Sequence, residues 1–465
     1  MTSTLNRAGS AGTIGALSVV CLAQFLIALD YSIIYVALPS IGGELSLSAS
    51  LLQWVVSAYA VLFAGLLLVG GRVSDRFGAK RTFLVAVVVF GLASALGGFA
   101  QDGAALLAAR GVQGLAAAFL QPAILGLISA TFASGTARSR ALALWGAVGA
   151  SGLAAGVVLG GVLTALSWRW TFLINVPLTL LAAVGGLLWL AAGVRARSGE
   201  RVPLTAAVLG TGALLAFVVS LTLVADPAAS SALVGGAFLV AALLVIGFLV
   251  NEARSQNVMV DRSLRGDRSL KVGIVATYLY MASVGSEFYL VTLLLQELEN
   301  FSPLWAGLGF LPLAALVTLG NMAAGRAVER IGAETTLTLG FLISAAGLAL
   351  LAVLLGSGPY ATHLLPGLLL SGFGHGVIYT SMFVIGTRDV PEGHQGSAGA
   401  LMTTSQYLSA AVTVALLTIV LGPVPEAGEF RWAFLVTTGF AVAGALLAPL
   451  ALRRRARAQG GEEVS

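Results

Sequence analysis

Gly71-Arg72-Val73-Ser74-Asp75-Arg76-Phe77-Gly78-Ala79 is the stretch that decides the architecture of this chain, because the chain contains it twice. The second copy, Gly325-Arg326-Ala327-Val328-Glu329-Arg330-Ile331-Gly332-Ala333, begins at 325 rather than 71, 254 residues further on. Glycine, arginine, an acid, arginine, glycine and alanine recur at the same spacing, and each copy ends an apolar run. A repeat of this period predicts a duplicated membrane domain, and therefore a transporter.

The composition indicates a membrane protein. Of the 465 residues, 58% are hydrophobic and 10% are charged, whereas a soluble domain carries about 25% charged residues. Because such a chain cannot cover a water-facing surface, we expect an all-α polytopic membrane protein. The single cysteine, Cys21, lies inside an apolar run, so neither a disulfide framework nor a cysteine-based metal site is expected. We ascribe the net charge of +5 to basic residues that set the orientation of the chain in the membrane, and it does not suggest binding to nucleic acid.

Fourteen apolar runs are long enough to cross a bilayer, since a transmembrane helix needs roughly 20 apolar residues. The first run is too long for a cleavable signal and is interpreted as a retained helix. The loops are short, and no soluble domain is inserted. The predicted spans are residues 13–39, 50–71, 81–100, 104–131, 139–166, 170–194, 203–225, 230–251, 271–297, 303–325, 334–356, 360–386, 396–421 and 430–452.

The distribution of basic residues predicts the orientation. With the N-terminus inside, 22 of the 25 Lys and Arg residues fall in cytoplasmic segments. Arg169 and Arg431 fall on the outer side, and Arg110 lies within a span. By the positive-inside rule, we expect a multi-pass protein of the cytoplasmic membrane with both termini in the cytoplasm.

The period of the repeat divides the fourteen spans. It covers eight spans, and because eight is even both copies face the same side, as a parallel repeat requires. We therefore predict a 6+2+6 arrangement with pseudo-twofold halves. Its parts are an N-terminal six-helix half at 1–200, two extra transmembrane helices at 201–252, a charged cytoplasmic linker at 253–270 that favours an amphipathic surface helix, and a C-terminal six-helix half at 271–465.

Two acids lie well inside apolar runs, Asp30 and Glu287, in the first helix of each half. They are 257 residues apart, so they occupy nearly equivalent places. An ionisable group at bilayer depth costs at least about 2.5–3.5 kcal/mol and normally faces a cavity. The hypothesis is that one or both carry the coupling proton, and the alternative is that each is a buried packing residue. Arg110, the one embedded cation, needs a counter-charge, and Asp30 is the predicted partner; the alternative is an arginine that caps carbonyls.

Two further features suggest gating. In residues 71–81, the glycines permit a tight turn between two helices. Asp75 is placed to accept hydrogen bonds from backbone N–H groups at the start of a helix, and the basic residues can pair with acidic side chains or lipid phosphates. The residues assigned to this gating loop are Gly71, Asp75, Arg76, Gly78, Lys80 and Arg81. Small residues three or four apart let helices approach closely. Such a packing hinge, predicted at the seam between the halves, comprises Gly149, Gly152, Gly156, Gly160 and Gly161, although ordinary packing is the alternative.

Polar and aromatic residues inside the spans are candidates for a substrate cavity. Aromatic faces suit cationic or aromatic ligands, but each tyrosine could equally be a lipid-facing anchor, and His375 a hydrogen-bonded packing residue. The candidates are Tyr31, Tyr35, Gln113, Gln121, Tyr280, Tyr289, His375 and Gln406.

Motifs that resemble one family extend over nearly the whole chain. Besides the loop 71–81, they lie at 29–39, 53–59, 110–114, 168–177, and 302–308 with Pro312. Together they resemble the major facilitator superfamily, specifically its fourteen-helix drug:proton antiporter branch. The resemblance implies proton-driven efflux of amphipathic organic compounds, coupling roles for Asp30 and Arg110, and gating by Asp75 and its neighbours. One departure is Val157, which stands where the antiporter motif of the fifth helix has proline.

The predicted function is export of amphipathic drugs, antibiotics or related metabolites by alternating access between the two halves. We expect the functional form to be a monomer surrounded by membrane lipids. The chain has no Gly-x-x-x-x-Gly-Lys-Ser/Thr loop, so we expect no ATP, cofactor or metal, and a proton gradient as the energy source. A proton-coupled importer or symporter on the same fold is the alternative. Three scattered histidines argue against an enzyme.

Overall fold

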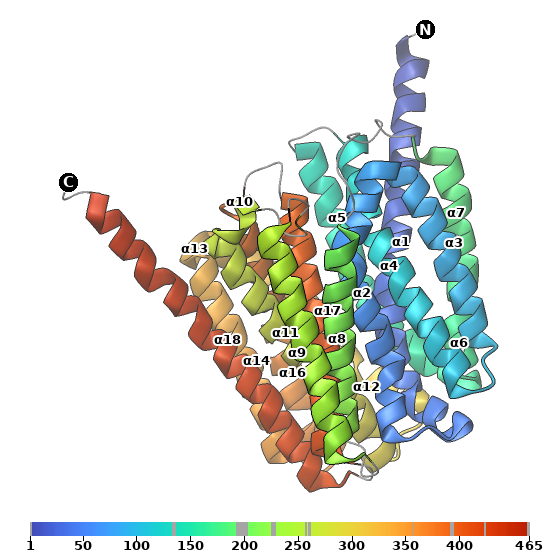
Figure 1. Cartoon of the computed structure of the whole chain (residues 1–465), viewed down its shortest axis with the longest axis vertical. Coiled ribbons are helices and arrows are strands. Elements are labelled where there is room, and N and C mark those ends of the chain that lie inside the picture. Colours follow the sequence, from blue (N-terminus) through green and yellow to red (C-terminus); the bar gives the residue numbers. More distant parts are fainter. Residues whose placement is uncertain are drawn as a thin grey trace. The chain divides into compact units, whose positions relative to one another are not determined.

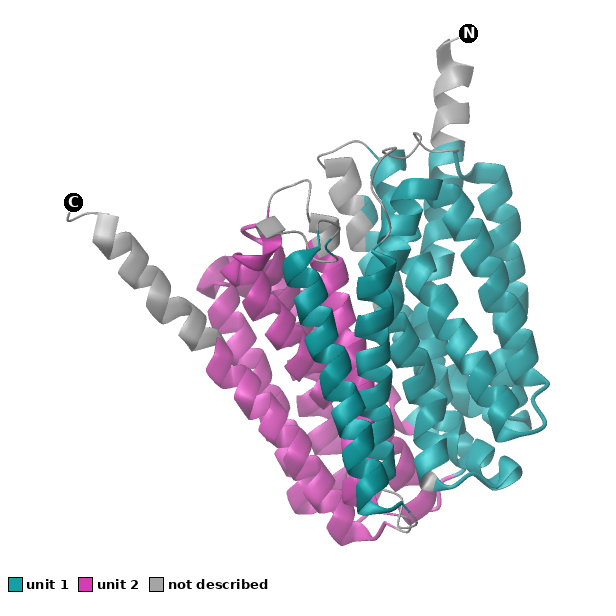
Figure 2. Ribbon diagram, in the orientation of Figure 1, with its two compact units in different colours: residues 1–259, 302–308 teal, residues 260–301, 309–465 magenta. Residues whose placement is uncertain are grey.

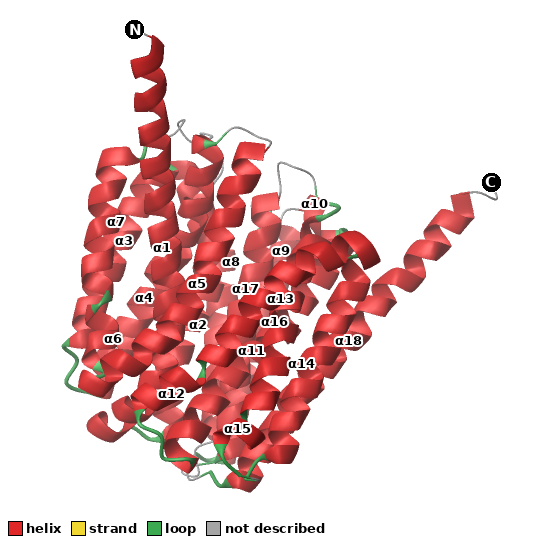
Figure 3. Ribbon diagram, turned by 180° about the vertical axis from the view of Figure 1, so that it is seen from behind, coloured by secondary structure: helices red, strands yellow, loops and turns green. Residues whose placement is uncertain are grey.

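The computed structural model is helical, with helices and loops but no strand in the part of the chain that it describes (Figure 3). The described residues are 2–132, 136–191, 203–224, 229–255, 258, 262–356, 358–390, 395–422 and 425–462.

The helices follow one another along the whole chain (Figure 1). Their bounds are α1 Thr2–Leu45, α2 Ala49–Phe77, α3 Ala79–Gly98, α4 Gly103–Thr131, α5 Thr136–Leu166, α6 Arg169–Leu173, α7 Asn175–Trp189, α8 Leu204–Val224, α9 Ser231–Arg254, α10 Arg262–Arg265, α11 Arg268–Leu293, the π-helical turn η1 Leu294–Leu298, α12 Pro303–Gly309, α13 Leu311–Ile331, α14 Ala333–Leu354, α15 Tyr360–His363, α16 Leu365–Thr387, α17 Gln395–Leu421 and α18 Ala427–Glu462.

Within the described residues, 14 helical segments are long and apolar enough to cross a membrane, which confirms the predicted number of spans. Three predicted spans, 170–194, 303–325 and 360–386, are each built from a short and a long helix, α6 with α7, α12 with α13, and α15 with α16. Pro177 and Pro312 lie in the first turns of α7 and α13. Since proline has no N–H to donate to the carbonyl four residues back, the helix is interrupted just before each of them.

The chain forms two compact units (Figure 2), residues 1–259 with 302–308, and residues 260–301 with 309–465. In unit 1, α1 packs on α4, α5 and α7, α2 on α4, and α3 on α4 and α7. In unit 2, α11 packs on α16, α17 and α18, α13 on α16, and α14 on α16 and α18. The same helix pairings therefore recur inside each unit, as a duplicated chain requires.

The two extra helices pack within unit 1. Val69 of α2 forms a buried apolar cluster with Ala206 and Ala207 of α8, and Trp54 Nε1 donates to Thr222 Oγ1 at 3.0 Å. Helix α9 packs on α8, and its large apolar side chains such as Leu243 and Ile246 are more than half exposed, as expected of a helix that faces lipid. The 6+2+6 boundaries remain a prediction.

The predicted linker 253–270 contains, among its described residues, only the single turn α10 between the end of α9 and the start of α11. Its residues 256, 257 and 259–261 lie outside the described part. An amphipathic surface helix over this linker is therefore not confirmed.

Candidate functional site

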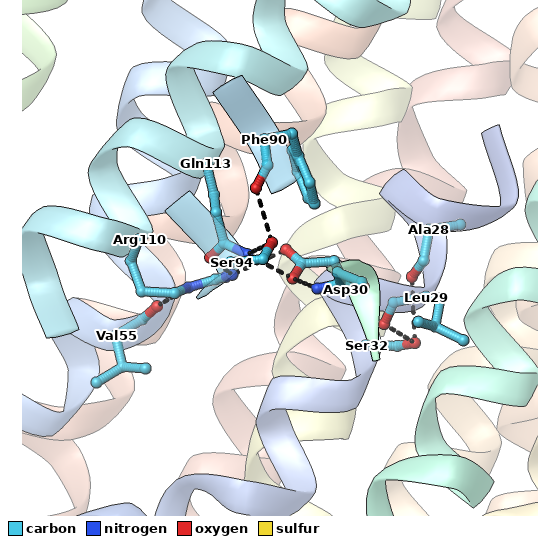
Figure 4. A network of polar contacts seen from close by, with 10 residues as sticks. Ala28, Leu29, Asp30, Ser32, Val55, Phe90, Ser94, Arg110 and Gln113 are labelled. Atoms are coloured by element: carbon cyan, nitrogen blue, oxygen red, sulfur yellow. Dashed lines mark hydrogen bonds and ion pairs between the residues drawn. The ribbon is translucent and has the colours of Figure 1, made fainter. Parts of the chain in front are cut away.

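Asp30 of α1 lies at the centre of a buried polar network in unit 1 (Figure 4). Arg110 Nη1 of α4 lies 2.8 Å from Asp30 Oδ2. Gln113 Nε2, one turn further along α4, donates to Asp30 Oδ1 at 3.0 Å. Asn175 Nδ2 at the start of α7 donates to the same oxygen at 2.7 Å. The predicted pairing of Asp30 with Arg110 is thus confirmed, and three side chains from two helices, α4 and α7, hold the carboxylate of α1.

Arg110 is itself held on several sides. Its Nε donates to the Val55 carbonyl of α2 at 2.7 Å and its Nη1 to Gln113 Oε1 at 3.0 Å. Its guanidinium lies over the Tyr59 ring, 4.5 Å from the ring centre. Arg110 therefore both balances the charge of Asp30 and donates to a carbonyl, so the two roles considered for it are combined.

Two members of the network were not found by sequence reasoning. Ser94 of α3 accepts from Gln113 Nε2 at 2.9 Å and donates to the Phe90 carbonyl at 2.8 Å. Asn175 gave a usable signal, because it is an amide inside an apolar span, whereas a serine such as Ser94 gives none. Gln113, predicted to line a cavity, is instead fully buried and bonded at both ends of its amide.

Glu287 of α11 lies in a second buried cluster, inside unit 2. Ser371 Oγ of α16 donates to Glu287 Oε1 at 2.5 Å. His375, one turn further along α16, brings its Nδ1 to 3.4 Å from Glu287 Oε2. All three side chains are buried, and the Tyr280 ring meets the His375 ring edge-on with centroids 6.1 Å apart. The His375 side chain, predicted as a cavity residue, thus lies against the second acid.

The other cavity candidates are internal to their units. Tyr35 donates to the Tyr31 hydroxyl at 2.9 Å, and the Tyr289 hydroxyl lies 3.2 Å from Thr418 Oγ1. The four candidate tyrosines are at most 4% exposed, so the alternative that they are lipid-facing anchors is wrong. Gln121 is 8% exposed on α4, and the Gln406 amide lies 3.9 Å from Met281 Sδ.

Most of the predicted gating loop is helical. Helix α2 continues to Phe77, so Gly71, Asp75 and Arg76 are helical and Asp75 lies in a last turn rather than at a helix start. The turn is Gly78 alone, with φ of 92°, and its counterpart Gly332 has φ of 84°.

The bases after this turn differ in their surroundings. Lys80 Nζ donates to the carbonyls of Leu187 and Leu190 at 3.2 and 2.6 Å, and so caps the C-terminus of α7 rather than an acid. Arg81 is exposed.

The glycines of α5 bring it against α1 inside unit 1. A Cβ on Gly152 or Gly160 would come within 2.9 Å of the Phe25 or Ile33 carbonyl, and one on Gly156 within 2.6 Å of the Leu29 carbonyl. Gly149 likewise faces Gln24. These four glycines therefore pack α5 closely against α1, and their place at the seam between the halves stays a prediction.

Gly161 differs from the other glycines of this face, because it meets α12. A Cβ there would lie 2.7 Å from the Pro303 carbonyl.

Comparison with known proteins gives one consistent family. The sequence profile described as Major Facilitator Superfamily matches residues 20–414. The chain is 37% identical over 413 residues to the puromycin resistance protein pur8 of Streptomyces alboniger, covering 87% of this chain and 81% of the relative. It is 34% identical over 450 residues to the cephamycin export protein CmcT of Amycolatopsis lactamdurans, covering 94% and 92%.

Among solved structures, a POT family transporter in complex with a thioalcohol conjugated peptide matches with a TM-score of 0.68 at 14% identity, covering 93% of this chain and 96% of the other. At this identity the match concerns the fold.

Proposed function

Because this chain belongs to the Major Facilitator Superfamily, we propose that it exports amphipathic organic compounds of the antibiotic class across the cytoplasmic membrane in exchange for protons. The observation that carries the direction of transport is the similarity, over most of both chains, to proteins named for antibiotic resistance and antibiotic export. The substrate is a small molecule, and the protein acts by alternating access.

The Asp30 network supports proton coupling. With Asp30 ionised, its charge and that of Arg110 cancel at a contact of 2.8 Å. Protonation of Asp30 leaves the Arg110 charge buried without compensation, which is strongly unfavourable in an apolar interior. The uncompensated charge of Arg110 then favours a different arrangement of the helices that hold it. Binding of one proton thereby shifts the equilibrium between two conformations of the protein. Gln113 and Asn175 keep the carboxylate in place between protonation events.

The energy source is the proton gradient, and no cofactor or metal takes part. One charge that moves down 100 mV releases about 2.3 kcal/mol, or roughly one and a half decades of substrate gradient. One or two protons are therefore sufficient for useful export. The role proposed for Glu287 is a second proton-carrying group in unit 2.

Gating is assigned to the first copy of the repeated segment. The connection between α2 and α3 comprises the helical residues Gly71, Asp75 and Arg76, the turn at Gly78, and the basic residues Lys80 and Arg81. We call the gating contact of this segment the latch. We assign it to the first copy because the second copy continues as Glu334-Thr335 and lacks the two basic residues. The glycines of α5 let α5 slide on α1 when the latch opens.

The orientation follows the basic residues, with both termini in the cytoplasm. The protein acts as a monomer, in contact with membrane lipids, protons and its substrate.

Transport in inside-out membrane vesicles tests this function. With the vesicle interior acidified, puromycin or a cephamycin is expected to accumulate, and a protonophore is expected to abolish the accumulation. Vesicles from cells that lack the protein are the control. Accumulation in right-side-out vesicles under an inward proton gradient would instead identify an importer.

A further inference from the structure

Among the described residues, no Lys or Arg pairs with the buried Glu287, whereas Arg110 pairs with Asp30. Glu287 Oε1 is bonded to Ser371, but Oε2 makes no hydrogen bond among the described residues. Both ring nitrogens of His375 likewise make none, and His375 Nδ1 lies 3.4 Å from Glu287 Oε2. Two buried polar groups thus lie against each other, each with an unfilled hydrogen-bonding position.

The charges around this cluster are confined to helix ends. Helices α16 and α17 contain no Asp, Glu, Lys or Arg, and the single acid of α14, Glu334, lies in its first turn and pairs with Arg388 at 2.8 Å. On α11, Arg268 and Lys271 lie in the first turn. The charged side chains of α13 lie in its last two turns, and Glu429 and Arg431 lie at the start of α18.

The remaining titratable neighbours are phenols. Tyr280 of α11 contacts the His375 ring, and Tyr379 of α16 contacts Tyr280 with ring centroids 5.7 Å apart. Tyr289 of α11 is engaged with Thr418 of α17. A phenol has an ordinary pKa near 10, so these groups contribute no positive charge. Glu287 and His375 must therefore reach neutrality between themselves.

Electroneutrality then assigns a proton to this pair. An ionised Glu287 beside a neutral His375 leaves one uncompensated negative charge in an apolar interior, which is costly. One added proton makes the pair neutral, whether it resides on the carboxyl or on the imidazole. A single O–H···N or N–H···O bond then fills the open positions of Glu287 Oε2 and His375 Nδ1, while His375 Nε2 stays without a partner among the described residues. The Asp30–Arg110 pair behaves in the opposite way, because it is neutral when empty.

We propose that Glu287 and His375 form a second proton-binding site, which holds one proton between Glu287 Oε2 and His375 Nδ1, with Ser371 as a positioning residue. The proton comes from water and returns to water, and no other bond forms or breaks. The proposal deepens the proposed function and rests on it only for the use of this proton in transport. The site itself exists independently of any substrate.

Infrared spectroscopy of the purified full-length protein in lipid, titrated with pH, tests the site without any substrate. Protonated carboxyls give a C=O band, carboxylates give their own stretching bands and protonated imidazoles give ring bands, and we expect one titrating set of these bands to disappear in Glu287→Gln and a different set in Asp30→Asn. His375→Phe should weaken proton binding at the Glu287 band about tenfold, the size of one lost charge-assisted hydrogen bond. An unchanged titration in His375→Phe would overturn the shared proton, and an unchanged spectrum in Glu287→Gln would overturn the site.

Two further variants keep the test decisive if Glu287→Gln does not fold. Ser371→Ala should shift the frequency of the Glu287 band, since it removes the donor at 2.5 Å. His363→Gln is the matched control, because His363 is a buried histidine of unit 2 outside the cluster, and the Glu287 band should be unchanged. A band shift in the control equal to that in His375→Phe would contradict the proposal. Because transport is not measured, failure here leaves the export assignment standing, and failed export leaves the site standing.

Discussion

The two units place an acid on equivalent helices but surround it differently. In unit 1, Asp30 of α1 meets Arg110 of α4 at 2.8 Å, and amides complete its shell. In unit 2, Glu287 of α11 meets Ser371 and His375 of α16, and within the described part of the chain no arginine pairs with it. The duplicated backbone thus provides two similar positions for a carboxyl, while the side chains of the facing helix decide which protonation state is neutral.

A second contrast concerns the contact that each of these first helices makes with its neighbour. In unit 1, glycines of α5 such as Gly156 allow α1 to approach. In unit 2, hydroxyls of α17 reach the backbone of α11 instead, from Ser405 to the Ile274 carbonyl at 2.9 Å and from Ser409 to the Tyr278 carbonyl at 2.6 Å. Close glycine packing joins the first pair of helices, whereas bonds from hydroxyls to carbonyls join the second.

Removal of a counter-charge should have the largest effect and should separate the two acid sites. Arg110→Ala leaves Asp30 charged and unpaired, so we expect a loss of about 3–5 kcal/mol in stability. His375→Ala removes no permanent charge and should cost less. Thermal unfolding of the purified variants measures both. The double variant Asp30→Asn/Arg110→Ala should recover part of the loss, and equal losses for Arg110→Ala and His375→Ala would contradict the electrostatic distinction.

Substitution of a glycine in the contact between α5 and α1 should have the next largest effect on stability. A Cβ at Gly156 would overlap the Leu29 carbonyl of α1, so Gly156→Ala should destabilise by about 1–3 kcal/mol. Gly146 of the same helix is the matched control, because a Cβ there meets nothing within 4 Å. Urea or thermal unfolding distinguishes the two variants. Similar stability of both would show that α5 does not need to approach α1 so closely.

The two copies of the turn should be equal in stability and different in function. Gly78 and Gly332 have φ of 92° and 84°, so alanine at either should cost on the order of 1–2 kcal/mol. If the first copy is the latch, Gly78→Ala should slow export more than Gly332→Ala, measured as initial rates at equal expression. A greater loss of rate in Gly332→Ala would move the latch to the second copy.

The smallest expected effect is at the cap of α7. Lys80→Met removes the donor to Leu187 and Leu190 and the favourable charge at a helix C-terminus, which contributes about 0.3–1 kcal/mol. The exposed Arg81 provides the control substitution Arg81→Met, whose stability should match that of the wild type. A greater loss in Arg81→Met, read from unfolding midpoints, would rule out the cap.

Hydropathy and the repeated segment were sufficient to predict the fourteen spans and the fold class, because a bilayer imposes length and apolarity on every helix. They were also sufficient for the Asp30–Arg110 pair, since one buried cation and one buried acid in unit 1 had few other partners. The interruptions at Ile174 and Phe310 were missed, because a short helix before a proline has the same hydropathy as an unbroken one.

The finer contacts of the site depend on how each helix is rotated about its axis. Asn175 bonds to Asp30 across 145 positions of sequence, and His375 approaches Glu287 across 88. Hydropathy does not determine which side of one helix faces which side of another. The same holds for the α5 glycines, whose spacing predicted a close helix contact but not that α1 was the partner. Side-chain neighbours across helices therefore had to come from the structure.

The most direct test of the account is energy-coupled transport by Asp30→Asn in membrane vesicles, with the compound that the wild type exports. We expect this variant to lose accumulation driven by the proton gradient but still to exchange labelled for unlabelled substrate, because the binding path remains and only the coupling proton is lost. Accumulation against a gradient at the wild-type level in Asp30→Asn would contradict the assignment of the coupling proton to Asp30.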